Sequence, residues 1–483
     1  MTDTTAFTDL NANGNISTHA VTTKLTVALP GRVYLPGSDA YTSSVNSYFY
    51  CTARQSPAVI LRPETVEEVA AAVKELAAHP EIKFAVRSGG HAPHANSSNI
   101  ENGVTIDLRG LNFIRDSKDR DDVVETGPAV EWGDIYEHLE KTGRTCVGSR
   151  ESSVGVAGFI TGGGLSFFAP ELGFACDNIA GVEVVLASGE IVNANHKENA
   201  DLFRAIRGGQ SNFGIVTRFD IITHKQPSYW GGGILYPDFT EDAQLQAWVD
   251  LKKGDHDPHV AVVQSFLYFG AQKAFVVSNN MAYLRPIEKP EDLKGFEDIQ
   301  PQIQGTMRLD STKNFALELQ GWQPQNQYAV YGTTTIKISV ALGKKINKIW
   351  HDATETIADA EALTSVLTYQ TLPPVFKDNP NGMGIDPELE LHKSHVVLII
   401  SIYWAEEKET ERITKLVETA IKEIEQVAKG EGALHEYRYS NYAGSFQDPV
   451  KSYGEKTLAE LKEVSKKYDP HGLFQKQAVG FRL

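Results

Sequence analysis

A short apolar run that ends in a pair of glycines constrains this chain more than any other feature. Residues 82–86 are typical of a buried strand, and Arg87-Ser88-Gly89-Gly90-His91 follows them directly. Two adjacent glycines allow the backbone to turn sharply and to come close to a ligand. Successive N–H groups in such a turn form a concave anion site, and Arg87 adds a positive charge that could reach a phosphate. His91 would project beside whatever this loop holds.

The glycine loop lies within a β–α–β pattern. A strand is predicted over 57–61, and Pro63-Glu64-Thr65 precedes a helix whose apolar positions share one face. A second strand over 83–86 then leads into the glycines. Open α/β sheets bind ligands at the carboxyl ends of their strands, so this loop is a candidate ligand site.

A second glycine-rich stretch covers residues 153–164. Five of the ten residues from Gly155 to Gly164 are glycine, which is costly in backbone entropy. Apolar residues are interleaved with the glycines, which argues against a plain linker. A segment that passes tightly alongside a large flat ligand accounts for both features. A third glycine-rich turn, 208–214, leads into a predicted strand.

Composition excludes several classes of function. The net charge of -16 argues against nucleic acid and anionic membranes as partners, because both would repel the chain. No run approaches the roughly 18 apolar residues that cross a bilayer. Residues 1–17 are polar and lack the apolar core of a signal peptide, which predicts a cytoplasmic protein, or a secreted one if a signal is missing from this sequence. Three cysteines and scattered histidines predict neither a disulfide framework nor a catalytic metal.

The length of 483 residues and the changes in pattern predict two domains. Residues 1–44 are expected to form a poorly structured arm with some extended pieces. From about residue 226 the glycine loops become sparse, and strand-like runs alternate with amphipathic helices up to about 430. This pattern is typical of an α+β domain that carries a broad sheet. The last segment, 431–483, contains Tyr439-Ser440-Asn441-Tyr442 and a helix over 455–468.

Four blocks in a fixed order carry a family resemblance. They are Arg87 to His91, Val154 to Gly164, Asp177-Asn178 with 208–217, and Tyr439 to Tyr442 with Tyr468-Asp-Pro. With these blocks the chain resembles FAD-linked oxidoreductases of the vanillyl-alcohol-oxidase/p-cresol-methylhydroxylase (PCMH) superfamily, in the berberine-bridge-enzyme-like branch. The match spans about 45–225 and 436–480. A GxGxxG fingerprint is absent from the sequence, which is consistent with this fold and argues against a Rossmann dehydrogenase.

The resemblance implies an α+β fold with a two-part FAD-binding domain of the PCMH type. Residues 45–225 and 431–483 would build that domain, and residues 226–430 would form an α+β substrate domain with a broad antiparallel sheet. The loop Arg87, Ser88, Gly89 and Gly90 would wrap the FAD pyrophosphate, and His91 would be bonded covalently to the flavin C8 methyl group. The remaining implied cofactor contacts are Val154, Gly155, Gly158, Asn178, Ile179 and Asn441 at the flavin and Val216 at the adenine.

One position departs from the pattern of some relatives. They carry a second flavin link through a cysteine three residues before the Val-Gly of the second block, where this chain has Glu151. Cys146 lies five residues further back, which is too far in register to replace it. We therefore expect a single histidyl link, with Cys146 and Cys176 as ordinary buried thiols.

The resemblance implies an oxidase that transfers a hydride from a small organic substrate to flavin, which molecular oxygen reoxidises to give hydrogen peroxide. Tyr442 is the first candidate for the base and Tyr439 the second. In a regular strand Tyr439 and Asn441 share a face and Tyr442 points the other way, so the strand must bend there. Both tyrosines could instead pack between the domains. The substrate could be an alcohol, an amine or a specialised metabolite; a carbohydrate oxidase, a flavin-dependent cyclase and a binding module with a structural FAD remain alternatives.

Overall fold

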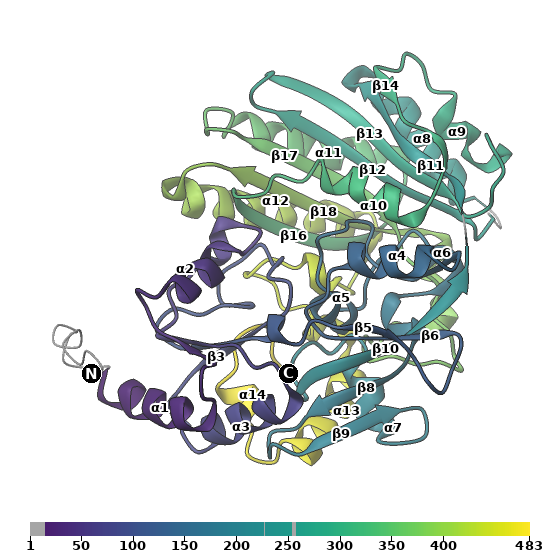
Figure 1. The fold of residues 1–483 in the computed structure, drawn as a ribbon. Coiled ribbons are helices and arrows are strands. Elements are labelled where there is room, and N and C mark those ends of the chain that lie inside the picture. Colours follow the sequence, from purple (N-terminus) through teal and green to yellow (C-terminus); the bar gives the residue numbers. More distant parts are fainter. Residues whose placement is uncertain (1–14, 227, 254–256) are drawn as a thin grey trace.

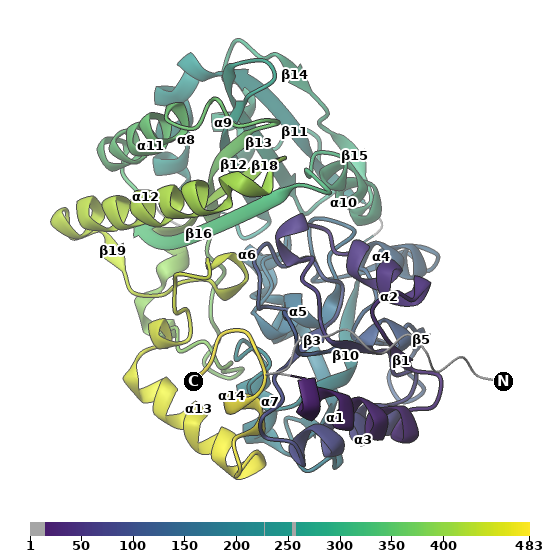
Figure 2. The same cartoon turned by 90° about the vertical axis from the view of Figure 1, so that its left-hand side faces the viewer.

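The computed structural model describes residues 15–226, 228–253 and 257–483, which form a layered α+β structure (Figure 1). Three sheets follow one another along the chain. The first two lie in the half of the molecule that holds both described ends of the chain, and the third forms the other half (Figures 1 and 2). Within the described ranges, no helix combines the length and apolar character needed to cross a membrane.

The first sheet has four strands in the order β1-β2-β4-β3. They are β1 (Val33–Tyr34), β2 (Val59–Leu61), β3 (Phe84–Arg87) and β4 (Val104–Asp107). β2 and β3 both pair in parallel with β4, which lies between them. Helix α3 (Val66–Ala77) connects β2 to β3 and begins where the Thr65 hydroxyl accepts a hydrogen bond from the Glu68 N–H. The predicted β–α–β opening is confirmed, and the glycine pair follows the carboxyl end of a parallel strand.

The second sheet has the order β5-β6-β10-β8-β9, with β7 paired to β10. Its strands are β5 (Ile114–Asp116), β6 (Val123–Thr126), β7 (Arg144–Cys146), β8 (Ile179–Val185), β9 (Ile191–Asn195) and β10 (Ile215–Lys225). Its helices are α4 (Trp132–Glu140), α5 (Val156–Thr161), α6 (Ala169–Leu172) and α7 (Ala200–Ile206). Val185 and Ile215 join the apolar core beneath α3, so the first two sheets share a core. The second glycine-rich stretch contains the short helix α5.

The third sheet has nine strands that pair antiparallel, as the predicted broad sheet requires. They are β11 (Tyr229–Pro237), β12 (Val260–Phe269), β13 (Ala274–Tyr283), β14 (Gln304–Gly305), β15 (Arg308–Asp310), β16 (Tyr328–Lys337), β17 (Thr364–Thr371), β18 (His395–Trp404) and β19 (Leu434–His435). Its helices are α8 (Glu241–Leu251), α9 (Lys294–Glu297), α10 (Thr312–Gln320), α11 (Val340–Glu355) and α12 (Thr410–Gly430).

The two faces of this sheet have different neighbours. Along β12, Val262 and Phe266 belong to the core that includes Trp248 of α8 and Trp350 of α11. The alternate residues Val263 and Leu267 line a cavity instead. Successive side chains of a strand point to opposite faces, so one face carries α8, α9, α11 and α12, and the other faces α10 and the first two sheets (Figure 1).

The C-terminal segment returns to the first sheet (Figure 2). Helices α13 (Glu455–Tyr468) and α14 (Leu473–Lys476) precede Gln477, whose side-chain amide donates hydrogen bonds to backbone carbonyls at Leu76 and Ile82. Ala478 forms a bridge with Phe84 of β3. The end of the chain is therefore held against the strand that carries the first glycine loop.

The N-terminal segment differs from the poorly structured arm with some extended pieces that we expected. Where it is described, it forms α1 (Asn15–Ala28) and α2 (Asp39–Asn46); residues 1–14 lie outside the described part. Val21, Leu25 and Leu29 are buried in the core that contains α3. Their spacing of four residues puts them on one face of a helix, which then packs as a layer rather than lying free.

Candidate active site

The glycine loops and the cavity face of the third sheet enclose one large cavity of about 520 Å³. At one end lie the loop of residues 88–91 and the stretch 154–158, together with Val216 and Phe481. At the other end lie side chains of β12, β13, β17 and β18. The cavity therefore joins the glycine loops to strands of the third sheet that lie far from them in the sequence.

The first and second glycine blocks touch backbone to backbone at the cavity wall. A Cβ on Gly89 would lie 2.7 Å from the Gly155 nitrogen, and a Cβ on Gly155 would lie 2.5 Å from the Gly89 nitrogen. Gly90 has a φ of +74°, which most other residues avoid. A Cβ on Gly162 would lie 1.9 Å from the Asn441 side-chain oxygen. Glycine is required at these positions because two chain segments share the space that a side chain would fill.

This arrangement fits a bound dinucleotide. Within the part of the chain that the structure describes, the N–H groups of Gly89, Gly90 and His91 donate to no protein acceptor. Unpaired N–H groups at the carboxyl end of a parallel strand form the type of concave site that holds phosphate. Val154, Gly158 and Val216 line the same cavity, as do Ser88 and Asn441.

Arg87 does not extend into this cavity. Its side chain is fully buried and donates hydrogen bonds to the backbone oxygens of Ser44 and Ser47 at 2.6 and 3.0 Å. The guanidinium also lies 3.7 Å from the ring centre of Tyr48. The prediction that Arg87 contacts a phosphate is therefore wrong, because backbone oxygens at the end of α2 bind its guanidinium. Its charge instead anchors the strand end that carries the glycines.

Asn178 and Ile179 also lie away from the cavity wall. The Asn178 side-chain amide donates to the backbone oxygens of Leu172 and Phe174 at 2.7 and 2.9 Å, and Ile179 is buried in the core. Neither residue lines the cavity, so the structure does not bring them to the place expected for flavin contacts. Asn178 instead closes the short turn that precedes β8.

Tyr439 is held by the second glycine block. Its buried phenolic oxygen accepts hydrogen bonds from the N–H groups of Gly164 and Leu165 at 3.1 and 3.0 Å, and from the Asn441 amide at 3.0 Å. Burial, with the nearby Tyr442 phenol, raises the pKa of Tyr439 far above its usual value. This tyrosine links the C-terminal segment to the glycine block.

The chain bends at the last block into a short 3₁₀ turn over Ser440–Tyr442. Because of this turn, Asn441 and Tyr442 both line the cavity, whereas a regular strand would direct them to opposite faces. The bend that sequence reasoning required is therefore present.

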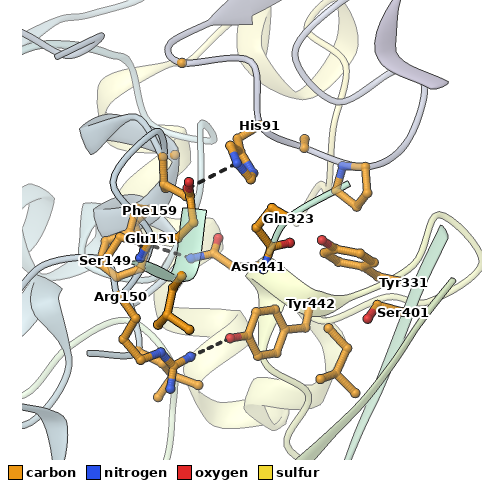
Figure 3. Close-up of a pocket in the computed structure, with 18 of the residues that line it drawn as sticks. His91, Ser149, Arg150, Glu151, Phe159, Gln323, Tyr331, Ser401, Asn441 and Tyr442 are labelled. Atoms are coloured by element: carbon orange, nitrogen blue, oxygen red, sulfur yellow. Dashed lines mark hydrogen bonds and ion pairs between the residues drawn. The ribbon is translucent and has the colours of Figure 1, made fainter. Parts of the chain in front are cut away.

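Arg150 is a site residue that sequence reasoning missed. Its guanidinium donates to the Tyr442 hydroxyl at 2.8 Å (Figure 3). It also donates to the side-chain oxygen of Gln370 at 2.5 Å. The Tyr442 hydroxyl donates in turn to the same Gln370 oxygen at 3.2 Å. Two charged residues, Arg150 and Glu151, directly precede a glycine block, and this position could have indicated a role at the site. No pattern pointed to Gln370, which lies in β17.

His91 lies against an aromatic wall and a carboxylate. Its ring stacks on Phe49, with ring centres 4.0 Å apart, and meets the Tyr50 ring edge-on at 5.5 Å. Its Nε2 is 3.3 Å from Oε2 of Glu151 (Figure 3). Cys146 and Cys176, by contrast, are fully buried and do not line the cavity, and burial raises the pKa of both thiols.

Comparison with known proteins identifies the cofactor domain. The profile of the FAD binding domain family matches residues 57–195. FAD-dependent monooxygenase sdcF of Emericella nidulans is 33% identical over 466 residues, which cover 94% of this chain and 96% of the relative. Bifunctional solanapyrone synthase of Alternaria solani is 32% identical over 454 residues, or 93% and 86% of the two chains.

Solved structures show the same fold. 6-Hydroxy-D-nicotine oxidase of Arthrobacter nicotinovorans superposes with a TM-score of 0.76 at 19% identity and covers 93% of this chain and 97% of its own. Glucooligosaccharide oxidase of Acremonium strictum, described with a 6-S-cysteinyl, 8α-N1-histidyl FAD, has a TM-score of 0.75 at 17% identity, with 95% and 98% covered. The chain thus belongs to the FAD-dependent oxidoreductases, and it shares the fold of berberine-bridge-enzyme-like proteins and related oxidases.

Proposed function

We propose that this protein is an oxidase that carries FAD covalently on His91. Bound FAD supplies hydride acceptance from a substrate C–H bond and reoxidation by molecular oxygen, with hydrogen peroxide as the second product. The observation that carries the proposal is the cavity itself, where His91, Tyr442 and glycine N–H groups without an acceptor among the described residues line one space. A neutral imidazole nitrogen is a competent nucleophile near neutral pH, which supports His91 as the point of attachment.

Tyr442 is the base in this proposal. The positive charge of Arg150, with 2.8 Å between its nitrogen and the Tyr442 oxygen, would stabilise the negative charge that forms when Tyr442 loses its proton. The Gln370 side-chain oxygen accepts a hydrogen bond from the Tyr442 hydroxyl and so orients the phenol. Tyr439 is poorly suited to the role, because three N–H donors occupy its oxygen inside the protein.

The far end of the cavity favours a largely apolar, uncharged substrate. Val263, Leu267, Val366 and Ile399 line it. Several polar groups there are already paired: the Ser265 and Thr368 hydroxyls bond each other at 2.8 Å, the Tyr331 hydroxyl bonds those of Tyr50 and Tyr403, and Glu318 binds Arg308. Groups that are satisfied internally compete poorly for sugar hydroxyls. A specialised metabolite with few polar groups therefore fits better than an oligosaccharide.

Two alternatives rest on the comparisons. Solved structures of oligosaccharide oxidases share the fold, which supports a carbohydrate oxidase. The relative named as a bifunctional synthase supports the alternative of a biosynthetic enzyme, such as a flavin-dependent cyclase of a specialised metabolite. The paired hydroxyls of Ser265 and Thr368 weigh against the first alternative. A cyclisation without net oxidation would consume no oxygen, which separates the second from the oxidase.

A substrate screen tests the function. The purified holoprotein is incubated with sugars, aromatic and aliphatic alcohols, amines and polyketide-type metabolites, and peroxide release and anaerobic bleaching of the flavin are recorded. We expect bleaching and peroxide with apolar aromatic compounds and not with oligosaccharides. A response to sugars alone would establish the carbohydrate alternative. A flavin that stays oxidised with every compound would instead favour a binding module.

The role of Arg150 gives a separate prediction. We expect Arg150→Met to slow anaerobic flavin reduction by roughly 10- to 100-fold, since a hydrogen bond to a charged group contributes about 1.5–3 kcal/mol. Arg150→Lys keeps the positive charge and should lose less. Stopped-flow absorbance with a substrate from the screen measures both rates, and flavin content serves as the control. Equal rates in the wild type and Arg150→Met would exclude a role for this charge.

A further inference from the structure

Glu151 and His91 form an isolated pair on the cavity wall. Their side chains are only 10% and 17% exposed, and 3.3 Å separates Oε2 from Nε2. Among the described residues, neither atom forms a hydrogen bond. The other Glu151 oxygen, Oε1, accepts hydrogen bonds from the Ser153 N–H at 3.1 Å and its hydroxyl at 2.8 Å. Glu151 is therefore fixed at one oxygen, and its second oxygen faces His91 alone.

The imidazole ring has little freedom to turn away. Phe49 stacks on one face of the ring, with an interplanar angle of 29°, and Tyr50 meets it edge-on at 82°. With Nε2 directed at the carboxylate, Nδ1 is the ring nitrogen that remains for the cavity (Figure 3). The aromatic contacts and the carboxylate thus set the orientation of the ring together.

A carboxylate beside one imidazole nitrogen determines the tautomer. Its negative charge, 3.3 Å away, favours a proton on Nε2, because a carboxylate can only accept a proton donor and the N–H bond directs its positive end toward the charge. The neutral ring then has its lone pair on Nδ1. A nitrogen with a free lone pair is what a bond to carbon requires.

We propose that Glu151 is the positioning residue for covalent attachment of flavin to His91. It holds the Nε2–H tautomer, so that Nδ1 is the attacking nitrogen, and it takes up the Nε2 proton after the new bond forms. This inference rests on the proposed covalent link. In the net reaction, one C–H bond of the flavin C8 methyl group and one N–H bond of His91 are replaced by a C–N bond. The two hydrogens leave with two electrons to molecular oxygen, which becomes hydrogen peroxide.

The test measures the covalent attachment of FAD to the polypeptide rather than the oxidation of a substrate. Apoprotein is mixed with FAD in air, and samples are precipitated with acid over time to measure the flavin that stays on the polypeptide. We expect Glu151→Gln to bind FAD, as judged by fluorescence quenching, but to attach it at least tenfold more slowly than the wild type. Glu151→Asp, which keeps a carboxylate, should recover part of the rate.

Glu131→Gln is the matched control. The carboxylate of Glu131 is close enough to interact electrostatically with Glu151 and His91. Unlike Glu151, it is exposed and does not line the cavity. Its attachment rate should equal that of the wild type. If Glu151→Gln does not fold, Glu151→Ala with added formate replaces it, and formate should accelerate attachment.

The outcomes separate the two proposals. Attachment in Glu151→Gln at the wild-type rate, or no gain from formate in Glu151→Ala, overturns the role of Glu151 while the covalent link stands. A wild-type protein whose flavin is entirely released by acid overturns the covalent link and the role of Glu151 with it, and leaves noncovalent FAD binding intact.

Discussion

Tyr442→Phe is expected to retain its flavin and to lower the rate of flavin reduction by roughly two to four orders of magnitude, the usual effect of losing a general base. Removal of one hydroxyl leaves the ring and its packing in place, so folding and flavin content are internal controls. Stopped-flow reduction without oxygen isolates this step from reoxidation. The measurement uses the substrate that the screen identifies.

Tyr439→Phe is the matched control for this prediction. Its hydroxyl accepts hydrogen bonds from the N–H groups of Gly164 and Leu165 and from the Asn441 amide. Loss of this hydroxyl should therefore lower the melting temperature of the protein, while the rate of flavin reduction stays close to that of the wild type. If Tyr439→Phe reduces its flavin slowly while Tyr442→Phe reduces it at the wild-type rate, Tyr439 is the base. Normal rates in both variants would place the base among the side chains of residues 226–430.

His91→Ala is expected to abolish covalent attachment completely. Acid denaturation of the wild-type protein should leave a yellow polypeptide, whereas the variant should release all of its flavin into the supernatant. The close packing of Gly89 against Gly155 does not involve the imidazole, so the variant should still bind FAD. Absorbance of pellet and supernatant measures the partition.

Peptide mapping of the wild type completes this test. The flavin peptide should contain His91 and neither Cys146 nor Cys176, because both thiols are fully buried outside the cavity. A cysteinyl flavin in the mass spectrum would contradict the single link. Acid-stable flavin in His91→Ala would contradict His91 as the point of attachment.

Local patterns in the sequence were sufficient for most elements and for the cofactor. Thr65 and the apolar face that follows it predicted α3, and the strand-like runs between 226 and 430 predicted the broad sheet that contains β12. These signals depend on neighbours within a few residues, which the sequence contains. The order of the four blocks, each near a predicted turn, was enough to identify an FAD enzyme.

The N-terminal helix shows a limit of the sequence reasoning rather than of the sequence. Val21, Leu25 and Leu29 carry a helical spacing, but the threonines in this stretch, which have low helix propensity, made the spacing easy to overlook. Burial against α3 supplies the stability that propensity alone does not, since short helices are marginal without packing.

The direction of individual side chains was decided by tertiary contacts. Arg87 was expected at the phosphate, but acceptors at Ser44 and Ser47 hold it elsewhere, and no local pattern links residues 40 positions apart. The Arg150–Tyr442–Gln370 cluster unites three distant segments through hydrogen bonds. The sequence by itself determined which chemical groups the chain has and where it can turn sharply. Only folding decided which of those groups share a cavity, because contacts between distant segments depend on how the layers pack.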